Sequence, residues 1–203
     1  DRTNFPAGRE VMQVMKSCAH PEPALSPPAK TASKPAKTPP KIVATYDYRD
    51  EAGELLLQVV RMEPKTFRQR RPDGDGWIWS AKDVRVVPYR LPELLAAPDA
   101  TVYLVEGEKD ADRLASLGLV ATTNVGGAGK WKLAHSEFLR GRRVVILPDN
   151  DEAGRDHAKK ANKSLRDIAA EVRIVALPDL PEKGVVSDWL DAGGSVQELV
   201  RMH

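Results

Sequence analysis

The sequence has one cysteine, no long apolar run and little net charge, and each shortage excludes a class of protein. Cys18 alone cannot form an internal disulfide, and it cannot supply a zinc site built from several cysteines. No apolar run approaches the ~20 residues that cross a membrane, and no signal-peptide pattern opens the chain. We therefore expect a cytoplasmic protein in a reducing compartment, with no membrane partner.

The formal net charge of +2 does not by itself indicate a nucleic-acid partner, but charges of opposite sign are separated along the chain. Residues 61–90 hold eight Lys or Arg against four acids, whereas acids gather in the motifs described below. Such a separation is typical of a protein that contacts phosphate with one surface and handles a metal with another. A basic, solvated face would have the same composition.

Composition divides the chain of 203 residues into three parts. Residues 1–41 combine a short amphipathic helix, expected at 8–18, with a linker rich in Pro, Ala and Lys. Residues 42–99 predict a small β-rich basic subdomain, with strands at 42–48, 55–61, 66–70 and 77–79 and a short helix from 91. The chain begins at Asp1 rather than Met, so we expect a fragment or a processed product.

From residue 100 to 203 strands alternate with helices, which is typical of a parallel sheet covered on both faces. Strands are expected at 101–105, 119–123, 143–147 and 171–176, and helices at 108–117, 132–139, 152–169 and from about 195. The predicted fold class is therefore α/β: a four-stranded parallel sheet flanked by helices, preceded by the small, mainly β subdomain.

Two acidic segments directly follow predicted strands, at 106–110 and at 149–151. Ligands of open α/β sheets bind at the carboxyl ends of the strands. Carboxylates crowded there repel one another unless a cation lies between them, and their hard oxygen atoms suit Mg²⁺ or Mn²⁺. Glu106 alone could be an acid that faces water, and Asp151 alone could be a helix cap. Matched positions on two strands favour a metal site.

The Gly-rich segment at 124–130 is not predicted to be an ATP-binding P-loop. That pattern requires Gly six residues before the Lys and Ser or Thr after it. Asn124 and Trp131 occupy these positions around Lys130. The backbone of the segment could still approach a phosphate.

Together these motifs resemble the Toprim family, the domain shared by topoisomerases and bacterial-type primases. VEGEKDADRL carries the first acidic motif, VVILPDNDEAG the second, and KGVVSDWLDAGG resembles the further acidic motif of the primase branch. TNVGGAGKW is similar to the loop after the second strand in phage and plasmid primase-helicases. The resemblance covers about residues 100–195, and the upstream YDYRD…FRQRRPDG…WIW unit resembles the small domain that precedes Toprim in those proteins.

The resemblance implies the metal-dependent nucleotidyltransferase core of a DNA primase from a phage, plasmid or other mobile element. Such an enzyme joins nucleoside triphosphates into RNA primers on a single-stranded DNA template during replication. A zinc-binding module and a replicative helicase, usual companions in this branch, would belong to other segments or to a partner.

The resemblance also implies roles for particular residues. Those expected to be catalytic and to hold Mg²⁺ or Mn²⁺ are Glu106, Asp149 and Asp151, with Asp188 as an added metal ligand. Glu106 is expected to act as a metal ligand or as the general base near the attacking 3′-hydroxyl. Asp110 fits the EGxxD pattern and is expected to orient the first helix or Lys109. Candidates for nucleotide or phosphate binding are Lys109 and Lys130. Those expected to bind single-stranded DNA by charge and stacking are Arg68, Arg70, Arg71, Trp77 and Trp79, although the two tryptophans could instead pack in a small core.

Two other functions stay open on the sequence. One is a Toprim nuclease, in which the same metals activate water, and the other is a non-catalytic DNA-binding Toprim module. A topoisomerase is disfavoured because its nucleophilic tyrosine comes from a separate domain. The four tyrosines lie in or beside predicted strands: Tyr46, Tyr48, Tyr89 and Tyr103.

Overall fold

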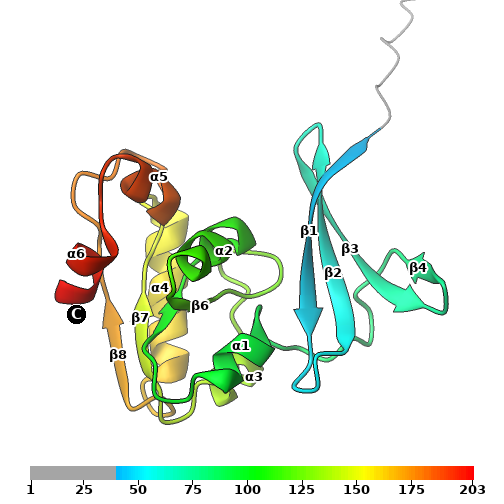
Figure 1. Cartoon of the computed structure of the whole chain (residues 1–203), viewed down its shortest axis with the longest axis horizontal. Coiled ribbons are helices and arrows are strands. Elements are labelled where there is room, and N and C mark those ends of the chain that lie inside the picture. Colours follow the sequence, from blue (N-terminus) through cyan, green and yellow to red (C-terminus); the bar gives the residue numbers. More distant parts are fainter. Residues whose placement is uncertain (1–39) are drawn as a thin grey trace, which may run out of the picture. The chain divides into compact units, whose positions relative to one another are not determined.

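The structure is a computed structural model, and it describes residues 40–203 (Figure 1). The helix expected at 8–18 and the linker after it lie outside the described residues, so both stay predictions. Among the described residues, no helix is both long and apolar enough to cross a membrane.

The first part of the described chain is an antiparallel sheet in the order β1-β2-β3-β4. Its strands are β1 (Lys41–Arg49), β2 (Leu55–Glu63), β3 (Thr66–Asp73) and β4 (Gly76–Ile78). The turn between β1 and β2 is closed by Asp50, whose Oδ1 accepts hydrogen bonds from the backbone N–H groups of Ala52 and Glu54, both at 2.9 Å. Gly53 completes this turn with a φ of 86°, a conformation that side chains with a Cβ rarely adopt. All four predicted strands are present.

The two faces of this sheet differ chemically, because successive side chains of a strand point to opposite sides. One face buries Tyr48 and Leu57, which are opposite each other in the β1–β2 register. The other face carries a polar row in which Gln58 donates to Asp47 Oδ1 at 2.7 Å and Arg70 Nε donates to Gln58 Oε1 at 2.7 Å. The apolar face packs on the second part of the chain.

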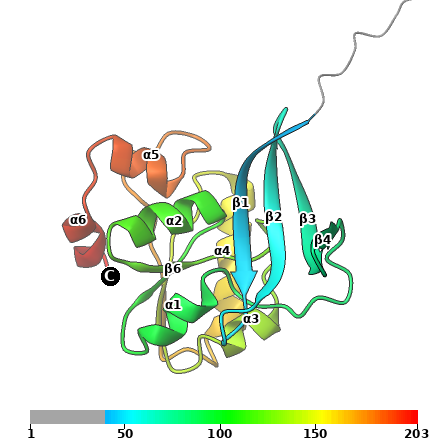
Figure 2. The ribbon, with the colours of Figure 1, turned by 45° about the vertical axis from the view of Figure 1, so that its right-hand side comes forward.

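The second part is a parallel sheet in the order β6-β5-β7-β8. Its strands are β5 (Val102–Leu104), β6 (Val120–Thr122), β7 (Arg143–Ile146) and β8 (Glu171–Ile174). The helices are α1 (Leu91–Ala96), α2 (Glu108–Ser116), α3 (Leu133–Glu137), α4 (Glu152–Leu165), α5 (Val186–Asp191) and α6 (Val196–Arg201). Helices cover both faces of the sheet, with α2 on one and α4 on the other (Figures 1 and 2). The predicted fold class is confirmed.

One helix prediction needs correction, and one helix was not predicted. The helix expected at 152–169 ends earlier, because the backbone N–H groups of Ile168 and Ala169 both bond the carbonyl of Leu165 and close a turn there. The segment at 186–191 was not expected to be helical, yet it forms α5. Its first turn is closed by Asp188, whose Oδ2 accepts from the N–H of Val185 at 2.9 Å.

The two sheets share one hydrophobic core within a single compact unit. Hydrogen bonds also join residues 40–90 to the part of the chain that contains the parallel sheet. The N–H of Tyr89 donates to the carbonyl of Thr123 at 2.9 Å, and the Tyr48 hydroxyl donates to Glu108 Oε1 at 2.8 Å. The predicted domain boundary between residues 99 and 100 stays a prediction, since packing continues across it.

His135 should make the stability of the protein depend on pH. The ring is buried, and desolvation lowers its pKa to about 4, while its Nδ1 accepts a hydrogen bond from the N–H of Lys132 at 3.0 Å. In the unfolded chain a histidine binds a proton below about pH 6.5. The free energy of unfolding should therefore fall as the pH drops from about 6.5 towards 4, because only the unfolded state gains the proton there.

Urea denaturation of the wild type and of His135→Asn at a series of pH values measures this effect. The asparagine amide oxygen can accept the same bond but does not titrate, so the variant should lose less stability over this interval. Equal losses in the two proteins would show that His135 does not contribute to the slope. His157, which is also buried with a lowered pKa, remains in both proteins.

Candidate functional site

The two acidic motifs meet at one edge of the parallel sheet. Glu106 follows β5 and Asp149 follows β7, and these strands are direct neighbours. The backbone N–H of Asp149 donates to Glu106 Oε1 at 3.2 Å. The geometry expected for carboxyl ends of parallel strands is therefore present in the structure.

Helix α4 fits closely beneath these acids because its first turn contains a glycine. Asp151 caps the helix, and its Oδ1 accepts from the N–H of Gly154 at 2.7 Å. A Cβ added to Gly154 would lie 2.5 Å from Glu106 Oε1 and 2.4 Å from the carbonyl oxygen of Asp149. No side chain fits in that space, so the helix and the acids pack directly against each other.

Burial and mutual repulsion change the acidity of this cluster. Burial raises the pKa of Asp149 to about 7, and the neighbouring charges of Glu106, Asp110, Asp151 and Asp188 act in the same direction. Burial is also the main cause that raises the pKa of Glu106, with Asp151 and Asp110 contributing. The site concentrates negative charge in a half-buried place, which a bound cation would neutralise.

Asp110 is placed more centrally than its expected role of orienting the first helix requires. It is buried, it lines the cleft beside Glu106, and its Oδ1 accepts from the Ser187 hydroxyl at 2.5 Å. Asp188 is exposed and is engaged at the start of α5. The role of Asp188 as an added metal ligand therefore stays a prediction, and Asp110 is the acid that geometry brings closer to the cleft.

Asn150, the middle residue of the second motif, ties the segment before α5 to the acids. Its side-chain amide donates to the carbonyls of Leu180 at 2.7 Å and Pro181 at 3.1 Å. Its backbone N–H donates to the carbonyl of Gly184 at 2.9 Å. These hydrogen bonds hold the second acidic motif against the segment that leads into the third.

A cleft of about 500 Å³ lies between the acids and the antiparallel sheet. Its acidic side is formed by Glu106, Glu108, Asp110 and Asp149, and Lys109 also lines it. Its opposite side comes from β2 and β3 and includes Arg61, Lys65 and Phe67. No motif in the sequence predicted a place in the cleft for these three residues. The alternation of side chains along a strand could have identified them, because it places Arg61 and Phe67 on the sheet face that carries Tyr46 and Val59.

The two phosphate-binding candidates are separated by the structure. Lys109 is exposed at the start of α2 and lines the cleft, whereas Lys130 lines a second, smaller cavity next to it. The Gly-rich segment forms part of both walls, because Gly126 lines the two cavities.

Four of the residues predicted to contact DNA form a stacked cluster on β3, on β4 and directly after β4. The Arg68 guanidinium lies 4.2 Å from the ring centre of Trp79, and the Arg70 guanidinium lies 3.9 Å from that of Trp77. Trp77 and Trp79 are 38% and 40% exposed, so neither is a core residue. We call these four residues the Arg–Trp ladder. Arg68 and Arg70 point to the sheet face opposite the one that lines the cleft, because Phe67 and Gln69 alternate with them.

Arg71 differs from its two neighbours. Its Nε is buried and has no hydrogen-bond partner among the described residues. It alternates with Arg70 and therefore belongs to the same face as Gln69. The structure thus brings two of the three predicted arginines together with the tryptophans and leaves the third apart.

The Gly-rich segment is held in place by a histidine that the sequence analysis did not identify. The N–H of Gly129 donates to His157 Nδ1 at 2.8 Å, and His157 lies on the buried side of α4. Asn124 supports the same segment from its other end, because its amide donates to the carbonyl of Gly127 at 2.9 Å. The sequence signal that could have identified His157 was its place on the buried side of α4, next to Ala158 and one turn after Gly154.

The donor set fits a hard divalent cation in its chemistry. It consists of carboxylate oxygens and is half-buried, and burial together with the neighbouring acids raises the pKa of Asp149. Within residues 40–203, however, no three potential ligands already form a closed metal-binding group. Side-chain rotations would have to complete such a site when an ion binds.

Comparison with known families agrees with this geometry. A family model described as Toprim-like matches residues 103–191. These residues therefore form a Toprim-like domain, and the recognition made from the three acidic motifs is confirmed. A search of curated protein sequences finds no match.

Solved structures of primases share the fold. The primase fragment of the bacteriophage T7 primase-helicase is 21% identical, with a TM-score of 0.50, over 78% of this chain and 61% of that one. The E. coli primase catalytic core is 22% identical, with a TM-score of 0.56, over 78% of this chain and 50% of that one. A DnaG primase catalytic domain bound to single-stranded DNA is 23% identical, with a TM-score of 0.57, over 78% and 51%. The chain thus spans about half the length of the two bacterial-type cores.

We predict that Gly154→Ala lowers the stability of the protein and weakens metal binding at the acids. The added methyl group overlaps Glu106 Oε1 and the Asp149 carbonyl, so α4 must move away from the acids. We expect a loss of stability of about 1–3 kcal/mol, the usual range for overpacking, together with weaker Mn²⁺ binding by calorimetry.

Gly76→Ala is the matched control. The nearest atom to its new Cβ is the Asp73 carbonyl oxygen at 3.6 Å, an ordinary contact. This variant should keep the wild-type Mn²⁺ affinity. Unchanged stability and Mn²⁺ affinity in Gly154→Ala would contradict the close packing of α4 on the acids.

Proposed function

We propose that this chain is the nucleotidyltransferase core of a DNA primase, which makes RNA primers on single-stranded DNA with Mg²⁺ or Mn²⁺. The observation that carries the proposal is the cleft in which Glu106, Asp110 and Asp149 face Arg61 and Lys65 across one cavity. Polyphosphate needs positive charge on both sides, from the protein and from metal ions held by acids. The Toprim-like match and the primase fold neighbours support the same class.

The residues of the chain would divide the work between the two walls. Glu106, Asp149 and Asp151, with Asp110 or Asp188, would hold the ions, which when bound stabilise the attacking and leaving oxygens. Lys109 and Lys65 would bind triphosphate oxygens from opposite sides of the cleft. Phe67, which is 51% exposed on the cleft wall, offers a ring on which a base can stack.

The single-stranded DNA template would also contact the Arg–Trp ladder. Its guanidinium groups are held by the indole rings, so their charge is presented with little conformational freedom to lose. The ladder and the cleft lie on opposite faces of one sheet. A template bound to both would have to pass over the edge of that sheet.

The context of a phage, plasmid or other mobile element, and a helicase partner, are further parts of the proposal. They are supported by the T7 fold neighbour, whose parent is a primase-helicase. A Toprim nuclease is the second candidate, because acids that hold metal at a strand end can serve cleavage as well as synthesis.

Primer synthesis should depend on the acids of the second motif. The chain is incubated with single-stranded DNA, labelled ribonucleoside triphosphates and Mn²⁺, and the products are separated by size. Asp149→Asn should reduce labelled primers at least about a hundredfold, in the range typical for loss of a group that stabilises transition-state charge. Asp156→Asn, the same change at an exposed position on α4, should retain full activity. Cut DNA without labelled primers would favour the nuclease and refute the primase.

Binding of single-stranded DNA should weaken when the ladder loses its charges. Arg68→Ala combined with Arg70→Ala should reduce affinity and flatten the salt dependence by up to about two units of slope, since each phosphate contact contributes about one. Fluorescence anisotropy at several salt concentrations measures both quantities. Lys163→Ala, an exposed change on α4, is the control. If the salt dependence of the double variant equals that of the wild type, the Arg–Trp ladder does not contact the template.

A further inference from the structure

A second cavity of about 280 Å³ lies beside the cleft, between the antiparallel sheet and the Gly-rich segment. Gln69 and Gly126 line both cavities, so the two are neighbours. Their chemistry is opposite. The cleft has four acids in its wall, whereas no Asp or Glu among the described residues lines the second cavity.

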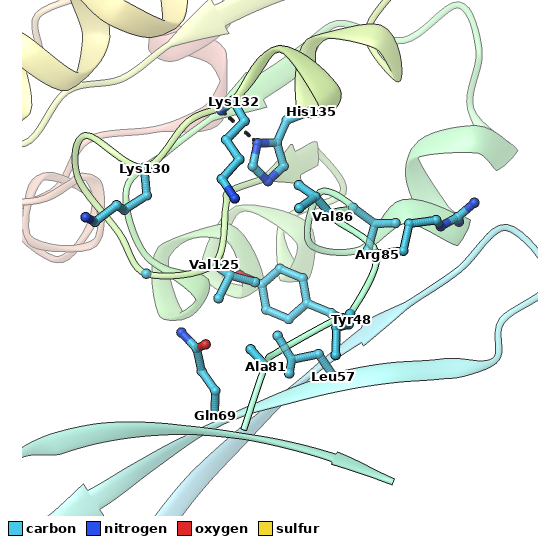
Figure 3. A pocket seen from close by; sticks show the side chains of 13 residues that line it. Tyr48, Leu57, Gln69, Ala81, Arg85, Val86, Val125, Lys130, Lys132 and His135 are labelled. Carbon is cyan, nitrogen blue, oxygen red and sulfur yellow. Dashed lines mark hydrogen bonds between the residues drawn. The ribbon is translucent and has the colours of Figure 1, made fainter. Parts of the chain in front are cut away.

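Lys132 and His135 bring hydrogen-bond donors to the second cavity. The Lys132 side chain extends into it, and Lys132 makes no ion pair with any described residue (Figure 3). His135 Nδ1 is occupied as an acceptor of the Lys132 N–H, so the neutral ring carries its proton on Nε2. Figure 3 shows this second nitrogen turned toward the cavity, on the same side as the Lys132 ammonium group.

The floor of the cavity is apolar. It is formed by the Tyr48 ring, Leu57, Ala81 and Val125, which come from the antiparallel sheet, the segment after it and the Gly-rich segment (Figure 3). Arg85 also lines the cavity, but its guanidinium is paired with Glu51. A ligand that fits must therefore have an anionic group for Lys132 and His135 and an apolar, compact body for the floor.

We propose that this cavity is a second binding site, which holds one nucleoside phosphate without a metal ion. The phosphate would bind the Lys132 ammonium group and the His135 Nε2–H, and the base would lie against Tyr48 and Val125. The volume suits one small molecule rather than a polymer. The preference for a base as the apolar body rests on the proposed function, whereas the need for an anion with an apolar body rests on the lining alone.

Occupancy of this cavity would affect the cleft. Gly126 belongs to the wall of both, and the Gly-rich segment is fixed by the bond between Gly129 and His157. If a nucleotide in the second cavity changes the affinity of the cleft for its substrate, the substrate must change the affinity of the second cavity by the same factor. The site would then let a free nucleotide regulate the metal-dependent site beside it.

Isothermal titration of the full chain with AMP in EDTA tests the proposal. EDTA removes metal ions and so removes the metal-dependent part of phosphate binding in the acidic cleft. AMP should bind, while adenosine and inorganic phosphate should each bind at least about tenfold more weakly, since each satisfies only half of the lining. Lys132→Gln should weaken AMP binding about tenfold or more, the usual effect of losing a charge-assisted hydrogen bond.

Three further proteins make the result specific. Ala81→Leu fills the floor and should also weaken AMP binding, whereas Lys163→Gln on the surface of α4 and Asp149→Asn in the cleft should not. Absence of AMP binding in EDTA, or AMP binding that survives in both Lys132→Gln and Ala81→Leu, would overturn the proposal. Phosphate that binds as tightly as AMP would also overturn it, because the base would then contribute nothing.

The two proposals fail separately. If AMP binds in EDTA but no primers are made, the cavity remains a nucleotide site and the proposed primase function is refuted. If primers are made but AMP does not bind in EDTA, the primase function stands and the second nucleotide site is refuted.

Discussion

The crowding of carboxylates at the ends of β5 and β7 is the constraint to which the rest of the structure responds. Parallel strands bring Glu106 and Asp149 together whatever their charges, and burial raises the pKa of Asp149 to about 7. The fold tolerates this because backbone N–H groups satisfy part of the acids: Asp149 N–H bonds Glu106, and Gly154 N–H bonds Asp151. The remaining negative charge faces the cleft, where a bound cation would neutralise it.

The antiparallel sheet gives that charge its counterpart. One face of the sheet brings Arg61 and Lys65 to the cleft, and the other face holds the Arg–Trp ladder. The bond between Tyr48 and Glu108 joins this sheet to the first turn of α2, next to Lys109. The small sheet therefore forms one wall of the cleft.

Much of this arrangement could be predicted from the sequence, because hydrophobic periodicity and strand-end acids are local signals. The strands, their alternation with helices, and the meeting of Glu106 with Asp149 needed no distant contacts. The central place of Asp110 depends on Ser187, which is 77 residues away, and the position of His157 under the Gly-rich segment depends on how α4 packs. The division of the arginines between two faces needed the exact strand register, which a shift of one residue reverses. Helix α5 was missed because its first turn relies on Asp188, which the sequence analysis had reserved for a metal.

Helix α4 has a consequence for how this site can be rebuilt. It begins at Asp151 in the acidic motif, passes beneath Glu106 at Gly154, and holds the Gly-rich segment through His157. These three contacts lie within two turns of one helix. Neither the acidic motif nor the Gly-rich segment can therefore be exchanged without α4. A chimera that takes the Gly-rich segment from a related protein should therefore take α4 from the same protein. Natural recombination within this domain is expected to keep the two segments together.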